Sequence, residues 1–198
     1  MADTHTVIGI DIGSISISIA EVDSAGAVGK TAYGFHRGKI EETLESLLSG
    51  FDLASSRGLA VTSSSPAVVK GASRYDGRVS VITAAKRLHD RFGSILIVGG
   101  EKFGLALFDG EGEYLNYRSN TSCAAGTGSF LDQQASRLNL SGIREFSERA
   151  YRNTGPVPKI ASRCAVFAKT DLIHAQQEGY SLDEICDGLS YGLVKNIA

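Results

Sequence analysis

The fold is decided by the stretch Val7–Ala20, which reads VIGIDIGSISISIA. Its first half is an apolar run that ends at Gly13, and its second half alternates isoleucine with small residues. An apolar run bounded by a glycine turn is typical of a buried strand, and alternation with a period of two is typical of a half-buried strand. The stretch therefore predicts a β-hairpin, which a third strand over about residues 28–35 extends into a sheet.

A similar pattern returns at Ile95–Glu101, which reads ILIVGGE. The glycines are again followed by alternating apolar residues, from Phe103, and by a further strand around residues 114–117. A pattern that recurs at a fixed spacing indicates an internal duplication. If Gly13 matches Gly100, the repeat spacing is about 87 residues.

The duplication predicts a first lobe over residues 1–93 and a second lobe over residues 94–198. Ser181 and Glu184 form a capping box at the start of the last helix, which reaches Ala198 without a stop signal. We therefore expect the second lobe to be truncated at its carboxyl end. Besides a short strand over residues 59–62, apolar spacing predicts helices over about 39–53, in the later part of 79–92, around 130–138, over 143–151, from the segment 160–168, and from Leu182 onward.

The composition is that of a globular protein. Its 198 residues are 42% hydrophobic and carry a formal net charge of −2, with no basic run. This balance gives no reason to expect a nucleic acid or an anionic membrane as a partner. Residues 1–6 lack the features of a signal peptide and no apolar segment is long enough to span a bilayer, so a cytoplasmic protein is expected. Three widely spaced cysteines argue against a disulfide framework.

The most unusual chemistry lies in the stretch Asn120–Phe130, which reads NTSCAAGTGSF. Gly126 and Gly128 let the backbone approach a ligand closely, and a helix that follows would point its free N–H groups at that ligand. An anion is the natural occupant, either a phosphate or a negatively charged thiolate cluster. The alternative is a glycine-rich turn between a strand and a helix, with Cys123 as a buried core residue.

Two strand–glycine turn–strand units in tandem resemble the duplicated actin/hexokinase/Hsp70-like fold, which is ribonuclease H-like. In that fold the two glycine turns are phosphate loops. The resemblance implies that Gly13 and Ser14 lie in the first loop and that Gly99 and Gly100 lie in the second. Ser14 would donate its hydroxyl and N–H groups to phosphate, unless it is only a polar residue on the solvent face of the strand.

Two longer segments, Cys123–Leu131 and Arg163–Asp171, resemble the BadF/BadG/BcrA/BcrD ATPase family, in particular the activators of 2-hydroxyacyl-CoA dehydratases. The continuation to Gln177 is most similar to the amino-terminal ATPase unit of the long, fused activases. The resemblance implies an ATP-dependent one-electron donor that binds ATP or ADP with Mg²⁺ and reduces a dehydratase-type partner. In the short activators two chains hold one [4Fe–4S] cluster, each with two cysteines.

The resemblance implies that Cys123 and Cys164 are the cluster ligands. A cubane cluster takes four thiolates, and two motif cysteines supply half of them. A homodimer, or the second ATPase unit of a longer chain, would supply the other pair. Cys186 lies on the apolar stripe of the last helix, which predicts a core role for it.

The nucleotide site implied by the resemblance also includes Gly126, Thr127 and Gly128. Asp11 is the predicted catalytic acid, acting through a metal-bound water, and the alternative is that its carboxylate only closes the turn. A carboxylate beside the phosphates orients Mg²⁺ or the attacking water.

The second loop departs from the family pattern, in which an Asp begins the loop and another acid follows the glycine pair. We place Val98 and Lys102 at those two positions, which leaves Glu101 as the candidate substitute acid. Together with the absence of the adenosine-binding region, these residues count against ATP hydrolysis by this unit alone.

Two other functions are therefore kept beside the activator. The departures favour a degenerate, non-catalytic ATPase half that holds part of a cluster and docks a catalytic twin. A sugar or acyl kinase of the same fold ranks third, because Gly126–Ser129 also resembles a phosphate loop of N-acetylglucosamine kinases. A kinase, however, has no use for Cys123 and Cys164.

Overall fold

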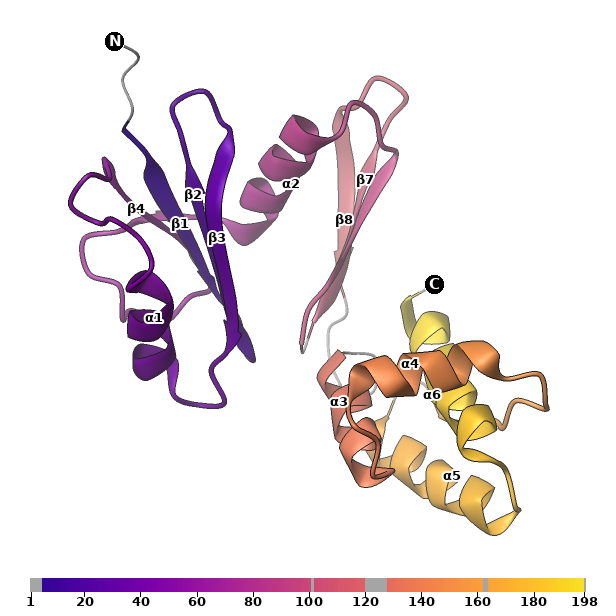
Figure 1. The fold of residues 1–198 in the computed structure, drawn as a ribbon. Helices are drawn as coiled ribbons and strands as arrows, with labels where there is room; N and C mark the ends of the chain where they lie inside the picture. The colour runs from indigo at the N-terminus through magenta and orange to yellow at the C-terminus, as the bar shows by residue number, and fades with distance from the viewer. Residues whose placement is uncertain (1–4, 101, 120–127, 162–163, 198) are drawn as a thin grey trace. The chain divides into compact units, whose positions relative to one another are not determined.

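The computed structural model of the protein describes residues 5–100, 102–119, 128–161 and 164–197. The chain divides into two compact units, Met1–Ile95 and Leu96–Ala198. Both units combine strands with helices (Figure 1), so the predicted α/β fold class is confirmed. No helix within the described ranges is long and apolar enough to cross a membrane.

The first unit is built on a five-stranded mixed sheet. Its elements are β1 (Val7–Ile12), β2 (Ser16–Val22), β3 (Val28–Phe35), α1 (Ile40–Leu48), β4 (Gly58–Thr62), β5 (Ser73–Tyr75) and α2 (Gly77–Leu88). The strand order is β3-β2-β1-β4-β5. β1, β2 and β3 are antiparallel neighbours, whereas β4 is parallel to β1 and β5 is parallel to β4. The loops that follow β1 and β4 therefore lie at the same edge of the sheet, where α/β proteins commonly bind ligands.

Isoleucines of β1 and β2 form the core of the first unit. Ile8, Ile10 and Ile12 alternate along β1 and are at most 3% exposed, and Ile17 and Ile19 of β2 are at most 2% exposed. Each such side chain stabilises the fold by about 2 kcal/mol when it leaves water. Helix α1 packs on β2 and β3. The predicted hairpin and the predicted third strand are thus confirmed, since the sequence alternation is an alternation of buried and exposed positions.

The second unit combines a three-stranded sheet, in the order β6-β7-β8, with four helices. Its elements are β6 (Ser94–Val98), which crosses the boundary between the units, β7 (Phe103–Phe108), β8 (Tyr114–Ser119), α3 (Gly128–Arg137), α4 (Ile143–Arg152), α5 (Ala165–Gln177) and α6 (Leu182–Ile197). The helices share one apolar core, whose fully buried members include Phe146, Leu172, Ile185 and Cys186. The core role predicted for Cys186 is confirmed.

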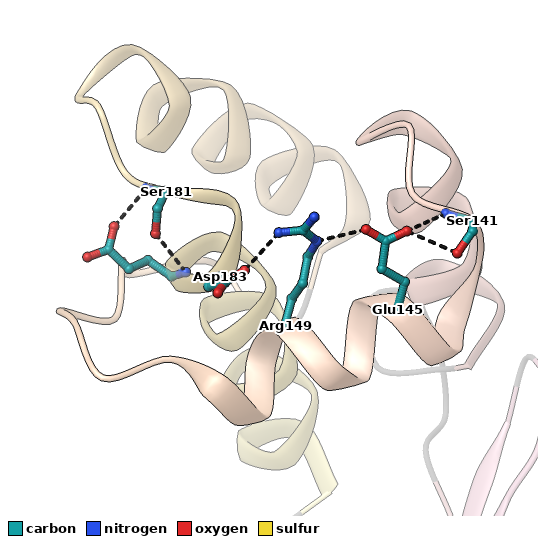
Figure 2. A network of polar contacts seen from close by, with 6 residues as sticks. Ser141, Glu145, Arg149, Ser181 and Asp183 are labelled. Atoms are coloured by element: carbon teal, nitrogen blue, oxygen red, sulfur yellow. Dashed lines mark hydrogen bonds and ion pairs between the residues drawn. The ribbon is translucent and has the colours of Figure 1, made fainter.

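A polar network joins α4 to α6 on the surface of this helical core (Figure 2). Glu145 accepts hydrogen bonds from the N–H and the hydroxyl of Ser141 and from Nε of Arg149, at 2.8, 3.0 and 2.9 Å. Arg149 reaches on to Asp183 of α6 at 3.0 Å. The predicted capping box of α6 is also present, with the Ser181 N–H and Glu184 carboxylate 2.7 Å apart.

The internal duplication is visible in the hydrogen bonds of the two hairpins. In each one, the carboxylate of an aspartate, Asp23 or Asp109, accepts the N–H groups two and four residues further on, at 2.9 and 2.8 Å. Gly26 and Gly112 complete the two turns with φ of 79° and 84°, a region in which glycine avoids steric strain. The two turns therefore correspond at an offset of 86 residues, from Asp23 to Asp109.

Strand pairing follows the same offset of 86 residues. The pairs Ala20–Thr31 and Ile19–Ala32 of the first sheet recur as Ala106–Tyr117 and Leu105–Arg118 of the second. Since the predicted spacing of 87 rested on matching Gly13 with Gly100, the structure corrects it by one residue.

Two sequence-based expectations about the elements were wrong, and one short strand was missed. Helix α2 begins at Gly77 rather than in the later part of 79–92, because the Asp76 carboxylate caps it by accepting the N–H groups of Arg78 and Val79. Helix α1 ends at Leu48, since Ser49 and Gly50 turn the chain, although Phe51 still packs in the core. The short strand β5 was not predicted; its three residues are all exposed, so they show no alternation.

Candidate functional site

The first glycine turn joins β1 to β2. The Gly13 N–H donates to the Ser16 carbonyl at 2.9 Å, and Ser14 lies exposed in the turn rather than on a strand. A buried histidine, His36, supports the turn: its Nδ1 accepts the Gly38 N–H at 3.0 Å, so Nε2 carries the ring proton and donates to the Gly13 carbonyl at 3.2 Å. His36 belongs to no periodic pattern of the sequence, so its role was not predicted.

Asp11, the predicted catalytic acid, lies at the carboxyl end of β1 with an exposed side chain. Its Oδ1 accepts the Thr62 hydroxyl at 2.6 Å, and Thr62 Oγ1 lies 2.8 Å from Ser65 Oγ. Ser65 in turn accepts the Ile12 N–H at 2.9 Å. The end of β4 and the loop that follows it thus contact Asp11 and Ile12, immediately before the first glycine turn, through the side chains of Thr62 and Ser65. Neither side chain was predicted from the sequence.

Arg74 holds the loop after β4 in place. Its guanidinium donates to the carbonyl oxygens of Ser63, Ser65 and Pro66, at 3.3, 2.9 and 3.1 Å. Three bonds from one planar group fix the path of the backbone, because guanidinium donors are held in a rigid fork. The loop is therefore constrained beside Asp11.

The second glycine turn meets the start of α3. The Gly99 N–H donates to the Lys102 carbonyl at 2.8 Å, as Gly13 does to Ser16. The Gly100 carbonyl accepts the Ser129 N–H at 3.1 Å and also the Ser129 hydroxyl. A Cβ on Gly128 would lie 3.6 Å from the Gly99 carbonyl oxygen. The structure thus brings together three predicted phosphate-site residues, Gly99, Gly100 and Gly128.

The matching turns also show which residues correspond between the halves. Gly13 corresponds to Gly99, so Asp11 corresponds to Ile97. Val98, which we took for the position of the missing acid, corresponds instead to Ile12, a core residue that is 2% exposed. The position at which the second turn lacks a carboxylate is therefore Ile97, one residue before Val98, where it was predicted.

Cys164 is the N-cap residue of α5. Its φ and ψ of −132° and 117° are extended, and its carbonyl accepts the Ala168 N–H at 2.9 Å to begin the helix. The half-buried thiol makes no capping hydrogen bond and is free, and the first turn of α5 contains no acidic residue. An anion-binding or metal-binding thiolate fits this position, because the N–H groups of a helix start favour negative charge.

The segment that leads to Cys164 is anchored from two sides. The Asp171 carboxylate, one turn and a half into α5, accepts the Ala161 N–H at 2.8 Å. Gly188 of α6 allows close packing on the other side, since a Cβ there would lie 2.9 Å from both the ring and the carbonyl oxygen of Pro158. Asp171, which ends the second cysteine motif, therefore has a structural role through its hydrogen bond to the Ala161 backbone.

The remaining predicted site residues, Glu101, Cys123, Gly126 and Thr127, lie outside the described residues. Among the described residues there is no group of three or more His, Cys, Asp or Glu side chains that could hold a metal ion. Cys186 is 0% exposed, and burial raises the pKa of its thiol to about 11. Burial in the helical core makes the Cys186 thiol less accessible to a metal ion than the half-buried thiol of Cys164.

Comparison with known proteins gives several activators of 2-hydroxyacyl-CoA dehydratases among the relatives. The 2-hydroxyisocaproyl-CoA dehydratase activator of Clostridioides difficile is 30% identical over 105 residues, which are 53% of this chain but only 39% of that protein. The solved activator of this dehydratase from Clostridium difficile, with bound ADPNP, superposes with a TM-score of 0.83 at 22% identity, over 97% of this chain and 73% of that one.

A second solved structure agrees. Component A of the (R)-2-hydroxyglutaryl-CoA dehydratase from Acidaminococcus fermentans gives a TM-score of 0.85 at 19% identity, over 98% of this chain and 76% of that one. At these identities the two structures show that the fold is shared. The sequence model of the BadF/BadG/BcrA/BcrD ATPase family matches residues 75–198, which include both cysteine motifs and the second glycine turn. With more than half of its residues matched, the chain belongs to the BadF/BadG/BcrA/BcrD ATPase family.

Proposed function

We propose that the chain is a unit of an ATP-dependent activator that passes an electron from a [4Fe–4S] cluster to a 2-hydroxyacyl-CoA dehydratase-type enzyme. The observation that carries the proposal is the position of Cys164 at the start of α5, with a thiol that takes no part in capping. Family membership and the activator relatives support the same function. A reducing compartment suits a thiolate-held cluster, so we place the protein in the cytoplasm.

In this proposal Cys123 and Cys164 each provide one thiolate, and a second unit provides the other two. The cluster, when bound, would supply a one-electron carrier. The second unit is either another copy of the chain or a further ATPase unit of a longer chain. The start of α5, free of acidic side chains, favours the negative charge of a thiolate at Cys164.

In the nucleotide part of the proposal, the glycine-rich turns bind phosphate. Gly13 and Ser14 would offer N–H and hydroxyl donors from the first turn. Gly99, Gly100 and the segment Gly126–Gly128 would offer donors from the second. Asp11 would orient the Mg²⁺ of the bound ATP, or a water held by it, since its carboxylate is exposed beside Gly13. Glu101 would add a second acid.

A specific observation favours a second candidate function. Ile97 occupies the position that corresponds to Asp11, and an aliphatic side chain orients neither a metal ion nor a water molecule. A degenerate ATPase half, which holds two cluster ligands and docks an active twin, is consistent with that difference. Both candidates require the cluster, and they differ in ATP turnover.

Iron and sulfide analysis after anaerobic reconstitution tests the proposal. We expect about four irons per two chains, as one cubane cluster requires. Cys164→Ser and Cys123→Ser should each abolish iron retention, because either change leaves too few thiolates. Cys186→Ala is the matched control and should retain iron, since that thiol is buried in the helical core. Iron retention that survives Cys164→Ser, or that depends on Cys186, would contradict the proposal.

A further inference from the structure

The hydrogen bonds between Asp11 and the loop after β4 have a direction that chemistry fixes. A backbone N–H can only donate, so Ser65 accepts from Ile12 at 2.9 Å. An ionised carboxylate can only accept, so the single hydroxyl proton of Thr62 goes to Asp11 Oδ1 at 2.6 Å. The contact of 2.8 Å between the two hydroxyls is then a donation from Ser65 to Thr62. The relay runs one way, from the Ile12 N–H to the Asp11 carboxylate.

This relay holds one carboxylate oxygen of Asp11, Oδ1, and leaves the other, Oδ2, available to a ligand. Within the described part of the chain, Thr62 is the hydrogen-bond partner of Oδ1, and Oδ2 accepts no hydrogen bond. Both ends of the relay belong to consecutive residues, Asp11 and Ile12, immediately before Gly13. The carboxylate and the start of the glycine turn are therefore held by the same loop.

The loop itself is well constrained. Ser65 is only 4% exposed, and Arg74 binds the backbone on both sides of it. Bonds in a chain strengthen one another by polarisation, and a donor that faces a carboxylate makes the stronger kind of hydrogen bond. The Thr62 hydroxyl thus holds one oxygen of the Asp11 carboxylate in the absence of a ligand.

We propose that Thr62 and Ser65 are positioning residues, which hold the Asp11 carboxylate so that Oδ2 faces the magnesium ion of ATP bound at the Gly13 turn. The inference rests on the proposed nucleotide function and deepens it. Neither residue touches the nucleotide in this account: Thr62 acts through Asp11, and Ser65 acts through Thr62. A carboxylate that is already held in place binds the metal–nucleotide complex without the entropic cost of ordering its side chain.

The test is the affinity of the full chain for ATP, measured once with Mg²⁺ and once with EDTA. Thr62→Val removes the hydroxyl and keeps the shape of the side chain. The factor by which Mg²⁺ increases the affinity for ATP should then fall about tenfold, which is the effect of losing one hydrogen bond to a charged group. Affinity for metal-free ATP should stay unchanged. Thr62→Ser restores the hydroxyl and should restore the gain, whereas Asp11→Asn should abolish it.

Thr31→Val is the control, since Thr31 is an exposed threonine of β3 outside the relay. A full magnesium-dependent gain in Thr62→Val would overturn the inference, and so would an equal loss of both affinities, which would make the loop merely structural. If the wild-type chain binds ATP under neither condition, the proposed nucleotide function fails instead, and the two failures are told apart by the wild-type measurement alone.

Discussion

The two halves of the repeat share a backbone and differ in chemistry. The hairpins β2–β3 and β7–β8 have the same aspartate-closed turn and the same strand register. The first half places Asp11 and two hydroxyls beside its glycine turn, whereas the second half has Ile97 at the corresponding position and contacts the start of α3 instead. The two turns therefore share a backbone geometry but differ in the side chains beside them.

The halves also differ in burial. Ile10 and Ile12 of β1 are 3% and 2% exposed, but the corresponding Leu96 and Val98 of β6 are 48% and 49% exposed. The glycine turns nevertheless make the same hydrogen bond. The turn geometry is thus set by local backbone hydrogen bonds rather than by the packing behind it.

The largest expected effect comes from truncating the matched residues Ile12 and Val98. Ile12→Ala removes a fully buried side chain and should lower the free energy of unfolding by about 2–5 kcal/mol. Val98→Ala should cost less than about 1 kcal/mol, because its side chain is half exposed and leaves little cavity. Urea unfolding of both variants gives the values. Similar losses for the two would contradict the burial difference.

The next effect tests the similarity of the two hairpin turns. Asp23→Ala and Asp109→Ala each remove a carboxylate that accepts two N–H groups, so each should destabilise by about 1 kcal/mol. The two losses should agree, because the hydrogen-bond distances in the two turns agree. Thermal unfolding of the pair measures them. A loss of stability in only one of the two variants would contradict the correspondence between the two hairpin turns.

The smallest effect is a sensitivity to acid of the network that joins α4 to α6. Hydrogen bonds from Ser141, and then from Arg149, hold the pKa of Glu145 below its usual value of 4.5. Because this pKa is lowered in the folded state, the stabilisation is complete above the unfolded-state pKa and is lost as the pH falls through the folded-state pKa.

Amide hydrogen exchange in α4 and α6 should therefore speed up in acid, while exchange in β1 and β2 should show no such step. The effect is small because the pair is partly exposed to solvent. Glu145→Gln should remove the dependence on pH. A step that persists in this variant would assign the acid sensitivity to another carboxyl.

Much of the fold was predictable because the patterns that determine it lie in short stretches of the sequence. Strand alternation in Val7–Ala20 and the capping box at Ser181 depend on neighbouring residues, and the structure has both. Helix α2 was misplaced because the cap at Asp76 was overlooked, although an Asp before a helix is a readable signal.

The site was less accessible to sequence reasoning. Ser65 bonds to a residue 53 positions away, and His36 bonds to Gly13 across 23 positions, so no spacing rule reveals either contact. The missing acid was placed at Val98 on the family pattern of the second loop, one residue after the position that the repeat assigns to it. Only the hydrogen bonds of the turns decided between Ile97 and Val98.

ATP hydrolysis by the full chain and by the variants Ile97→Asp and Val98→Asp tests the difference between the two turns most directly. We predict that Ile97→Asp raises the rate about a hundredfold, the lower range for one positioned acid or base. Val98→Asp should leave it unchanged, because that position corresponds to Ile12 and not to Asp11, and circular dichroism should confirm that both variants are folded. A gain in Val98→Asp, or no gain in a folded Ile97→Asp, would contradict the account.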